Sequence, residues 1–325
     1  MNASQLNSSI NKYTAVRWMV TAYVFIFTLW ISPFYVSGDQ TSYVKAYNGV
    51  SNLDLVDGYL LYSLTLSSFE IIPFFFTWIA SSLGLDKSLF MAISNATLAF
   101  LTIKLCKKLE VSLFVASIIV MTNFYLFVMY FAGDRLKFGF LFFIFSMLLL
   151  ERSKTFYSVA VVAVFSHFQM LLMYLSLSFY SLVTGIYNLF ISGRFSYRKL
   201  WFMVLLIPIA FALEPIHTKL ISYSQNSTEK SLFTFVNISL FLLLSLWYSK
   251  EKLRVVFIFI PLILAISVVG AERINLIGYF VFLYYGLQCK RGLNVGVLVT
   301  TLYFAIKSYN FTINIIQNGD GFAGL

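Results

Sequence analysis

Charged side chains are scarce in this chain. Of its 325 residues, 11% are Asp, Glu, Lys or Arg, whereas 60% are hydrophobic and 19% are aromatic. A soluble domain of similar size carries about a quarter charged residues, and the polar intervals here are too short for a separate soluble domain. The composition therefore predicts an all-α polytopic membrane protein that forms a single integral membrane domain over residues 1–325.

Cysteine and histidine are rare, with two residues of each. Cys106 and Cys289 lie far apart in the chain, so we expect neither a disulfide nor a metal site from them. The histidines have no Cys or paired carboxylates at ligand spacing, so we expect no metal. The chain contains no Walker motif, GxGxxG, GxSxG, HExxH or DxD. These absences argue against ATP-driven transport and metal-dependent use of sugar nucleotides, and we expect no cofactor.

Long apolar runs dominate the sequence instead. They lie near residues 15–37, 87–105, 111–131, 135–150, 155–191, 200–213, 231–248, 255–270, 274–289 and 292–308. The fifth run is too long for one span, so we divide it near His167–Met170, which gives about 10–12 transmembrane helices. The shorter apolar segment Phe69–Gly84 is predicted to contain a re-entrant or interfacial helix near 70–84.

Basic residues are distributed unevenly between the loops. With the N-terminus in the cytoplasm, 15 of the 23 basic residues fall in inner loops and 10 of the 13 acids fall in outer loops. This excess of Lys and Arg is typical of cytoplasmic loops, so the net charge of +10 does not predict nucleic acid as a partner. The predicted outer segments are Gly38–Glu70, Gly133–Arg135, the turn at His167, Glu214–Lys230, Gly270–Arg273 and the tail after Lys307.

Two arginines break this orientation rule in similar contexts. Arg135 in "AGDRLKFGF" and Arg273 in "VGAERINLIGYF" each follow an acid at the outer start of an inward-going helix. A plain turn explains the pattern if Asp134 or Glu272 caps the helix and the arginine reaches the headgroups. Alternatively, the two guanidiniums hold a lipid-linked phosphate or pyrophosphate, since the planar arginine fork suits phosphate oxygens.

Other candidate residues lie in the same predicted outer segments. His167, in "VFSHFQMLL", is either a packing histidine or a proton carrier at the outer face. Asp39, Tyr43 and Tyr47 share one helical face if "DQTSYVKAY" is a helix, which could line a sugar site or simply form an interfacial helix. Glu70 is followed directly by a strongly apolar run.

The order of these features resembles the EpsG-type branch of bacterial polysaccharide polymerases, which are related to the O-antigen and capsule polymerases called Wzy. The resemblance rests on "GDQTSY", "EIIPFF", "GDRLKFGF", "SHFQML" and "ERINLIGYF" in that order. It covers the chain from about Gly38 to Phe282.

This resemblance implies a multi-pass glycosyltransferase of the bacterial inner membrane with its active site facing the periplasm or exterior. It would join undecaprenyl-pyrophosphate-linked oligosaccharide repeat units in the bilayer, with flippase and chain-length regulator proteins as partners. We expect Arg135 and Arg273 to bind the pyrophosphate and His167 to assist. Asp39 or Glu70 would act as the base.

The remaining candidate residues are expected to bind the sugar: Tyr43, Tyr47, Asp134 and Glu272.

Two alternative functions stay open. A flippase or transporter of lipid-linked oligosaccharides would need charge near the bilayer midplane and internal repeats. Another membrane transferase, such as a ligase or acyltransferase, would need a larger outer loop or polar residues at the inner face.

Overall fold

The computed structural model describes residues 3–192 and 235–323, and these residues form helices joined by turns and short loops, without a strand. The predicted span 200–213 and the predicted outer loop Glu214–Lys230 lie outside the described residues. The chain divides into two compact units. Unit 1 comprises Met1–His167 and Leu298–Leu325, and unit 2 comprises Phe168–Val297.

Unit 1 contains most of the predicted outer segments. Its helices are α1 (Ala3–Ile31), α2 (Asp39–Gly49), α3 (Leu55–Leu66), α4 (Ile71–Ser82), α5 (Lys87–Lys108), α6 (Leu113–Thr122), α7 (Phe124–Phe127), α8 (Asp134–Leu148), α9 (Ser153–Ser166) and most of α16 (Val295–Asn318). Unit 2 contains α10 (Gln169–Ser192), α13 (Val236–Tyr248), α14 (Lys252–Val269) and α15 (Ala271–Gln288).

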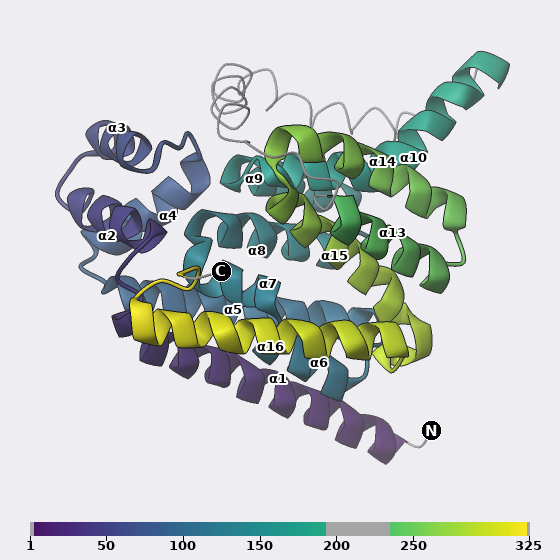
Figure 1. Ribbon diagram of the computed structural model, residues 1–325, viewed down its shortest axis with the longest axis horizontal. Helices are drawn as coiled ribbons and strands as arrows, with labels where there is room; N and C mark the ends of the chain where they lie inside the picture. The colour runs from purple at the N-terminus through teal and green to yellow at the C-terminus, as the bar shows by residue number, and fades with distance from the viewer. Residues whose placement is uncertain (1–2, 193–234, 324–325) are drawn as a thin grey trace. The chain divides into compact units, whose positions relative to one another are not determined.

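Helices α1 and α5 run antiparallel and form the base of unit 1 (Figure 1). The hydroxyl of Tyr13 donates to the carbonyl of Ile103 at 3.1 Å near one end. Near the other end, the buried amide of Asn95 donates both to Thr28 Oγ1 at 3.0 Å and to the carbonyl of Tyr130 at 2.9 Å. A buried amide that is bonded to two other segments fixes their register, because breaking either bond would leave a polar group unsatisfied.

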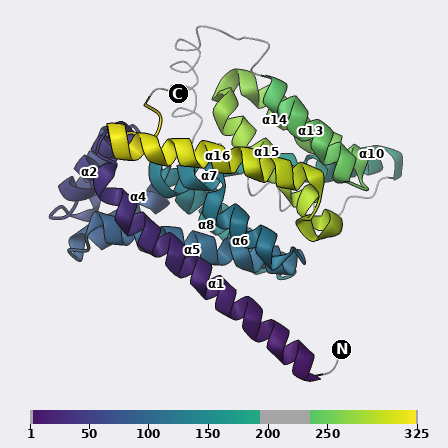
Figure 2. The ribbon, with the colours of Figure 1, turned by 60° about the horizontal axis from the view of Figure 1, so that its bottom comes forward.

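Several of the predicted outer segments that belong to unit 1 lie close together. Helices α2, α3 and α4 gather beside the C-terminal end of α1, as Figures 1 and 2 both show. The backbone amides of Val36 and Ser37 donate to the carbonyl of Gly319, which ties the end of α16 to the same place. At the end of α5, Lys108 pairs with Glu151 at 3.2 Å. Within unit 1, the ends of α1 and α16 thus lie together, and the end of α5 lies beside the loop that follows α8.

The predicted span 111–131 is broken rather than continuous. Helices α6 and α7 meet at Asn123 with a bend of 50°, and the Asn123 side chain accepts from the backbone amides of Tyr125 and Leu126. A π-helical turn, Val128–Ala132, then leads to α8. The hydroxyl of Ser308 on α16 donates to the carbonyl of Thr122 at 2.7 Å. Side chains therefore satisfy backbone groups that the break exposes.

The predicted re-entrant segment forms the second helix of a bent helical pair. α3 and α4 meet at an angle of 115° and together have the length and hydropathy of a broken span or a re-entrant loop. The helix over 71–82 agrees with the sequence prediction, whereas α3 falls in a segment predicted as an outer loop. Gly58 on α3 lies against the Trp78 ring of α4, since a Cβ added at Gly58 would lie 3.2 Å from Trp78 Cδ1. Helices α3 and α4 therefore pack closely at this point.

Three helices in the described part of the chain are long and apolar enough to cross a membrane, or five spans if each bent pair counts as one. The three are within Lys12–Phe34, Lys87–Lys108 and Gln169–Ser192. The predicted run 155–191 is divided, as expected, between Ser166 and Gln169. The apolar helices are compatible with a transmembrane protein.

Candidate functional site

Glu70 lies at the turn between α3 and α4. Ser67 ends α3 in the left-handed conformation (φ 46°, ψ 49°), and the chain then turns into Ser68 and Glu70. Only 3% of Glu70 is exposed. The hydroxyl of Ser68 donates to Glu70 Oε2 at 2.9 Å and accepts from the Glu70 backbone amide at 3.3 Å. The tight turn thus holds a buried carboxylate at a fixed position, which requires compensating partners.

Two distant segments supply these partners. Arg135, in the first turn of α8, places its NH1 group 3.1 Å from Glu70 Oε2. His167, at the end of α9, places Nδ1 in hydrogen-bond contact with Glu70 Oε1. The Glu70 carboxylate therefore joins three elements of unit 1. Its Oε2 accepts from the Arg135 guanidinium, and its Oε1 contacts the His167 imidazole. We name these three side chains the carboxylate bridge.

The imidazole of His167 has two different nitrogens. Nδ1 faces Glu70, whereas no hydrogen bond involves Nε2 within the described residues. The backbone of His167 is extended (φ −162°, ψ 121°), which ends α9. A carboxylate that accepts from Nδ1–H fixes the tautomer and leaves Nε2 as the proton acceptor. An imidazole held in this way is chemically able to accept a proton on Nε2.

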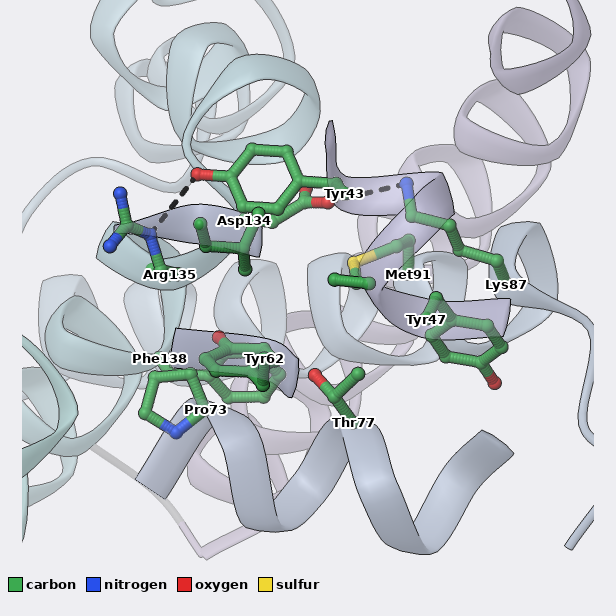
Figure 3. A pocket seen from close by; sticks show the side chains of 12 residues that line it. Tyr43, Tyr47, Tyr62, Pro73, Thr77, Lys87, Met91, Asp134, Arg135 and Phe138 are labelled. Atoms are coloured by element: carbon green, nitrogen blue, oxygen red, sulfur yellow. Dashed lines mark hydrogen bonds and ion pairs between the residues drawn. The ribbon is translucent and has the colours of Figure 1, made fainter. Parts of the chain in front are cut away.

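Tyr43 completes the surroundings of Arg135. Its hydroxyl accepts from Arg135 Nε at 3.4 Å, as the dashed line in Figure 3 shows. Burial raises the pKa of Tyr43 to about 12, so the phenol remains neutral under physiological conditions. Arg135 thus uses its Nε and NH1 groups within the protein, while 21% of its side chain remains exposed. The NH2 group makes no hydrogen bond to the described residues.

A second ion-pair cluster lies directly beside Arg135. Asp134 Oδ2 is 3.4 Å from Lys87 Nζ, and Asp134 Oδ1 is 3.6 Å from Lys137 Nζ. Lys137 is fully buried and also contacts Met91 Sδ at 3.2 Å. Lys87 in turn donates to Gln40 Oε1 at 2.5 Å. The cluster joins α2, α5 and α8, and its two cations share one carboxylate.

The two clusters border a narrow cavity of about 10 Å³, the space of one water molecule (Figure 3). Arg135 and Asp134 lie above it, and Tyr62, Pro73 and Phe138 form its apolar side. The apolar wall lowers the local dielectric and so strengthens the ion pairs. Among the described residues, no group of three or more His, Cys, Asp or Glu side chains could hold a metal ion.

The structure brings together Glu70, His167, Arg135, Tyr43 and Asp134 of the sequence-predicted site residues. Tyr47 is buried nearby, and its hydroxyl donates to the carbonyl of Leu85 at 2.7 Å. Asp39 is exposed in the first turn of α2, and among the described residues no hydrogen bond or ion pair joins it to the carboxylate bridge.

Glu272 and Arg273 are exposed in the first turn of α15, which belongs to unit 2. The carbonyl of Arg273 accepts from Gln169 Nε2 at 2.7 Å, so its backbone is fixed within that unit.

Sequence reasoning overlooked four side chains of these clusters: Ser68, Lys87, Lys137 and Gln40. The charge pattern places Lys87 and Lys137 among the basic residues on the outer side but gives them no role. A signal was present for Lys137, since it follows Asp134 by three positions and so lies on the same helical face. Comparison with protein-family models, with curated proteins and with solved structures finds no match to this chain.

Proposed function

We propose that this protein is a membrane glycosyltransferase that polymerises oligosaccharide repeat units carried on undecaprenyl pyrophosphate. The reaction takes place at the outer face of the bacterial inner membrane, and the product is an O-antigen, capsule or exopolysaccharide. The resemblance in the order of sequence motifs suggests this family. The observation that carries the proposal is the carboxylate bridge, in which Glu70 joins Arg135 and His167.

The chemistry requires a base for the acceptor hydroxyl and a cation for the leaving group. The acceptor oxygen bonds to C1 of the donor sugar as the bond between C1 and the pyrophosphate oxygen breaks. The hydroxyl proton moves to Nε2 of His167, and the electron pair leaves with undecaprenyl pyrophosphate. Arg135 stabilises the negative charge that develops on the phosphate, through the part of its guanidinium that faces away from Glu70.

Glu70 has an orienting role in this proposal. Both of its carboxylate oxygens already bind protein groups, Arg135 and Ser68 on one side and His167 on the other. A buried carboxylate so occupied is better placed to hold the imidazole than to take a proton from a sugar. The proposed base is therefore His167, in place of the Asp39 or Glu70 expected from the sequence, and Arg273 remains a proposed second phosphate ligand.

Surface polysaccharide from a deletion strain provides the test. The strain is complemented with wild type, Arg135→Lys or His167→Gln, and glycan chain length is resolved on a gel. We expect a ladder with wild type and single repeat units with either variant, because a lysine lacks the planar fork and glutamine lacks an acceptor nitrogen. Arg254→Lys is the matched control, since Arg254 is an exposed arginine paired with Glu251 at 3.0 Å.

The outcomes separate the alternatives. A full ladder from Arg135→Lys at wild-type protein level would contradict the phosphate role of Arg135. A deletion strain without any exported repeat units would favour a flippase, because export rather than polymerisation would have failed. A deletion strain that keeps its full ladder would overturn the proposed function itself.

A further inference from the structure

A larger cavity lies beside the carboxylate bridge in unit 1. It has a volume of about 300 Å³ and is bounded by the C-terminal end of α1, by α2, by the start of α5 and by the turn before α8. Lys87 and Asp134 line both this cavity and the narrow one in Figure 3. Its size is at the lower limit of small-molecule sites, which begin at about 300 Å³. The space therefore suits a small ligand next to the proposed reaction site.

Aromatic rings form much of the cavity wall. Tyr35, Tyr47, Tyr130 and Phe131 line it, and the three tyrosine hydroxyls are already engaged. They donate to Asp320 at 3.4 Å, to the Leu85 carbonyl at 2.7 Å and to the Val120 carbonyl at 3.3 Å, respectively. The rings therefore offer apolar faces rather than new hydrogen bonds, as suits the C–H faces of a sugar ring.

Unused polar atoms occur between these rings. Asp134 is buried, and its Oδ2 accepts no hydrogen bond although Lys87 lies 3.4 Å away. The side-chain amide of Asn48 and the hydroxyl of Ser88 also line the cavity and make no hydrogen bond to the described residues. A buried acceptor without a donor costs free energy unless a ligand or water supplies one. A ligand hydroxyl would satisfy the buried Asp134 Oδ2, and the exposed Asn48 amide and partly exposed Ser88 hydroxyl are accessible to the same ligand.

The cavity lining carries no excess of positive charge. Lys87 is its cation, and Asp86 and Asp134 are its anions. Lys137, which lies outside the lining, pairs with Asp134 at 3.6 Å. A site for a phosphate or a carboxylate would need an excess of positive charge. We infer that this cavity binds one or two rings of a neutral glycan. That the glycan is the acceptor end of a repeat unit rests on the proposed function, whereas sugar binding itself does not.

The proposal is tested with the purified full-length protein in detergent micelles. The probe is the free oligosaccharide released by mild acid from the surface polysaccharide of the bacterium that carries the gene, and binding is followed by saturation-transfer NMR. Val44→Trp places a large ring into the cavity from an exposed position on α2. Val56→Trp, at an exposed position on α3 outside the cavity, is the matched control.

We expect saturation transfer to the sugar with wild type and Val56→Trp but none with Val44→Trp. Asn48→Leu should weaken sugar binding about tenfold, because leucine cannot form the hydrogen bonds that the Asn48 amide would make to the sugar. Asn52→Leu, in the adjoining exposed turn, should leave sugar binding unchanged. Equal binding by Val44→Trp and wild type would overturn the assignment, as would no binding by wild type. Displacement of the oligosaccharide by inorganic pyrophosphate would overturn the neutral-glycan assignment in favour of an anion site.

The acceptor role has a separate readout. In the complemented deletion strain, Val44→Trp should give single repeat units where Val56→Trp gives the full ladder. A full ladder from a Val44→Trp protein that has lost sugar binding would overturn the acceptor role and leave the sugar site in place. A deletion strain that keeps its ladder would overturn the proposed function while the binding result still decides the sugar site.

Discussion

Replacing Glu70 with glutamine tests the carboxylate bridge as a unit. Glutamine keeps the size of the side chain but removes its charge, so Arg135 loses its buried ion-pair partner at 3.1 Å. Breaking a buried ion pair from one side costs about 3–5 kcal/mol. Because 21% of the Arg135 side chain is exposed and Tyr43 still accepts from Nε, we expect the lower end of this range, about 3 kcal/mol.

An exposed pair of similar geometry in the same unit gives the control. Lys108 Nζ lies 3.2 Å from Glu151 Oε1, but 85% of the Glu151 side chain is exposed. Exposed pairs contribute about 0.2–1 kcal/mol, so Glu151→Gln should lower the free energy of unfolding by less than about 1 kcal/mol. Both variants are compared by denaturant unfolding in micelles, followed by tryptophan fluorescence.

A double variant separates the ion pair from other effects. Arg135→Gln combined with Glu70→Gln removes both charges, so the double variant should lose less stability than the sum of the single variants, by about 1–3 kcal/mol. Equal losses for Glu70→Gln and Glu151→Gln, or strictly additive losses in the double variant, would refute the inference that burial makes this pair important.

Three further perturbations address the surroundings of the site and the packing of unit 2. Asp134→Asn leaves the buried Lys137 without its carboxylate and should cost about 3 kcal/mol of unfolding free energy; a loss below about 1 kcal/mol in denaturant unfolding would contradict this. Tyr43→Phe should leave the pH profile of polymer formation unchanged up to about pH 10, since the Tyr43 pKa is raised to about 12. A change in activity below about pH 10 that wild type shows and Tyr43→Phe does not would contradict this expectation. Gly278→Leu should cost about 1–3 kcal/mol, because an added Cβ meets Ile238 Cδ1; unchanged thermal unfolding would show that α13 moves aside.

The helices were predictable to different degrees. The division of the run 155–191 could be predicted because it exceeds the length of one span, and the structure has a break between Ser166 and Gln169. The break at Asn123 was missed, because one polar residue hardly changes the hydropathy of a run of about 20 residues. Helix α3 was missed because its 12 residues are too few for a span and lie within the predicted outer segment Gly38–Glu70, although Asp54 is its N-cap.

The site was predictable residue by residue but not as an arrangement. Glu70, Arg135 and His167 each attracted attention as polar residues beside apolar runs. Their contacts join positions 65 and 97 apart in the chain, and helical periodicity relates side chains only within one helix. The role of Glu70 as a common partner therefore needed the three-dimensional structure. The same limit hid Lys87, which reaches Asp134 from another helix.

The hydrogen bond from Ser308 to the Thr122 carbonyl has a consequence for biosynthesis. The ribosome makes α6 and α7 long before α16, so the newly made bend at Asn123 must wait with that carbonyl unsatisfied or bonded elsewhere. The π-helical turn and the first turn of α8 follow this bend directly. Maturation of Arg135 and its neighbours is thus linked to the arrival of α16. Ribosomes stalled before residue 308 should hold an inserted chain whose bend at Asn123 is still incompletely fixed.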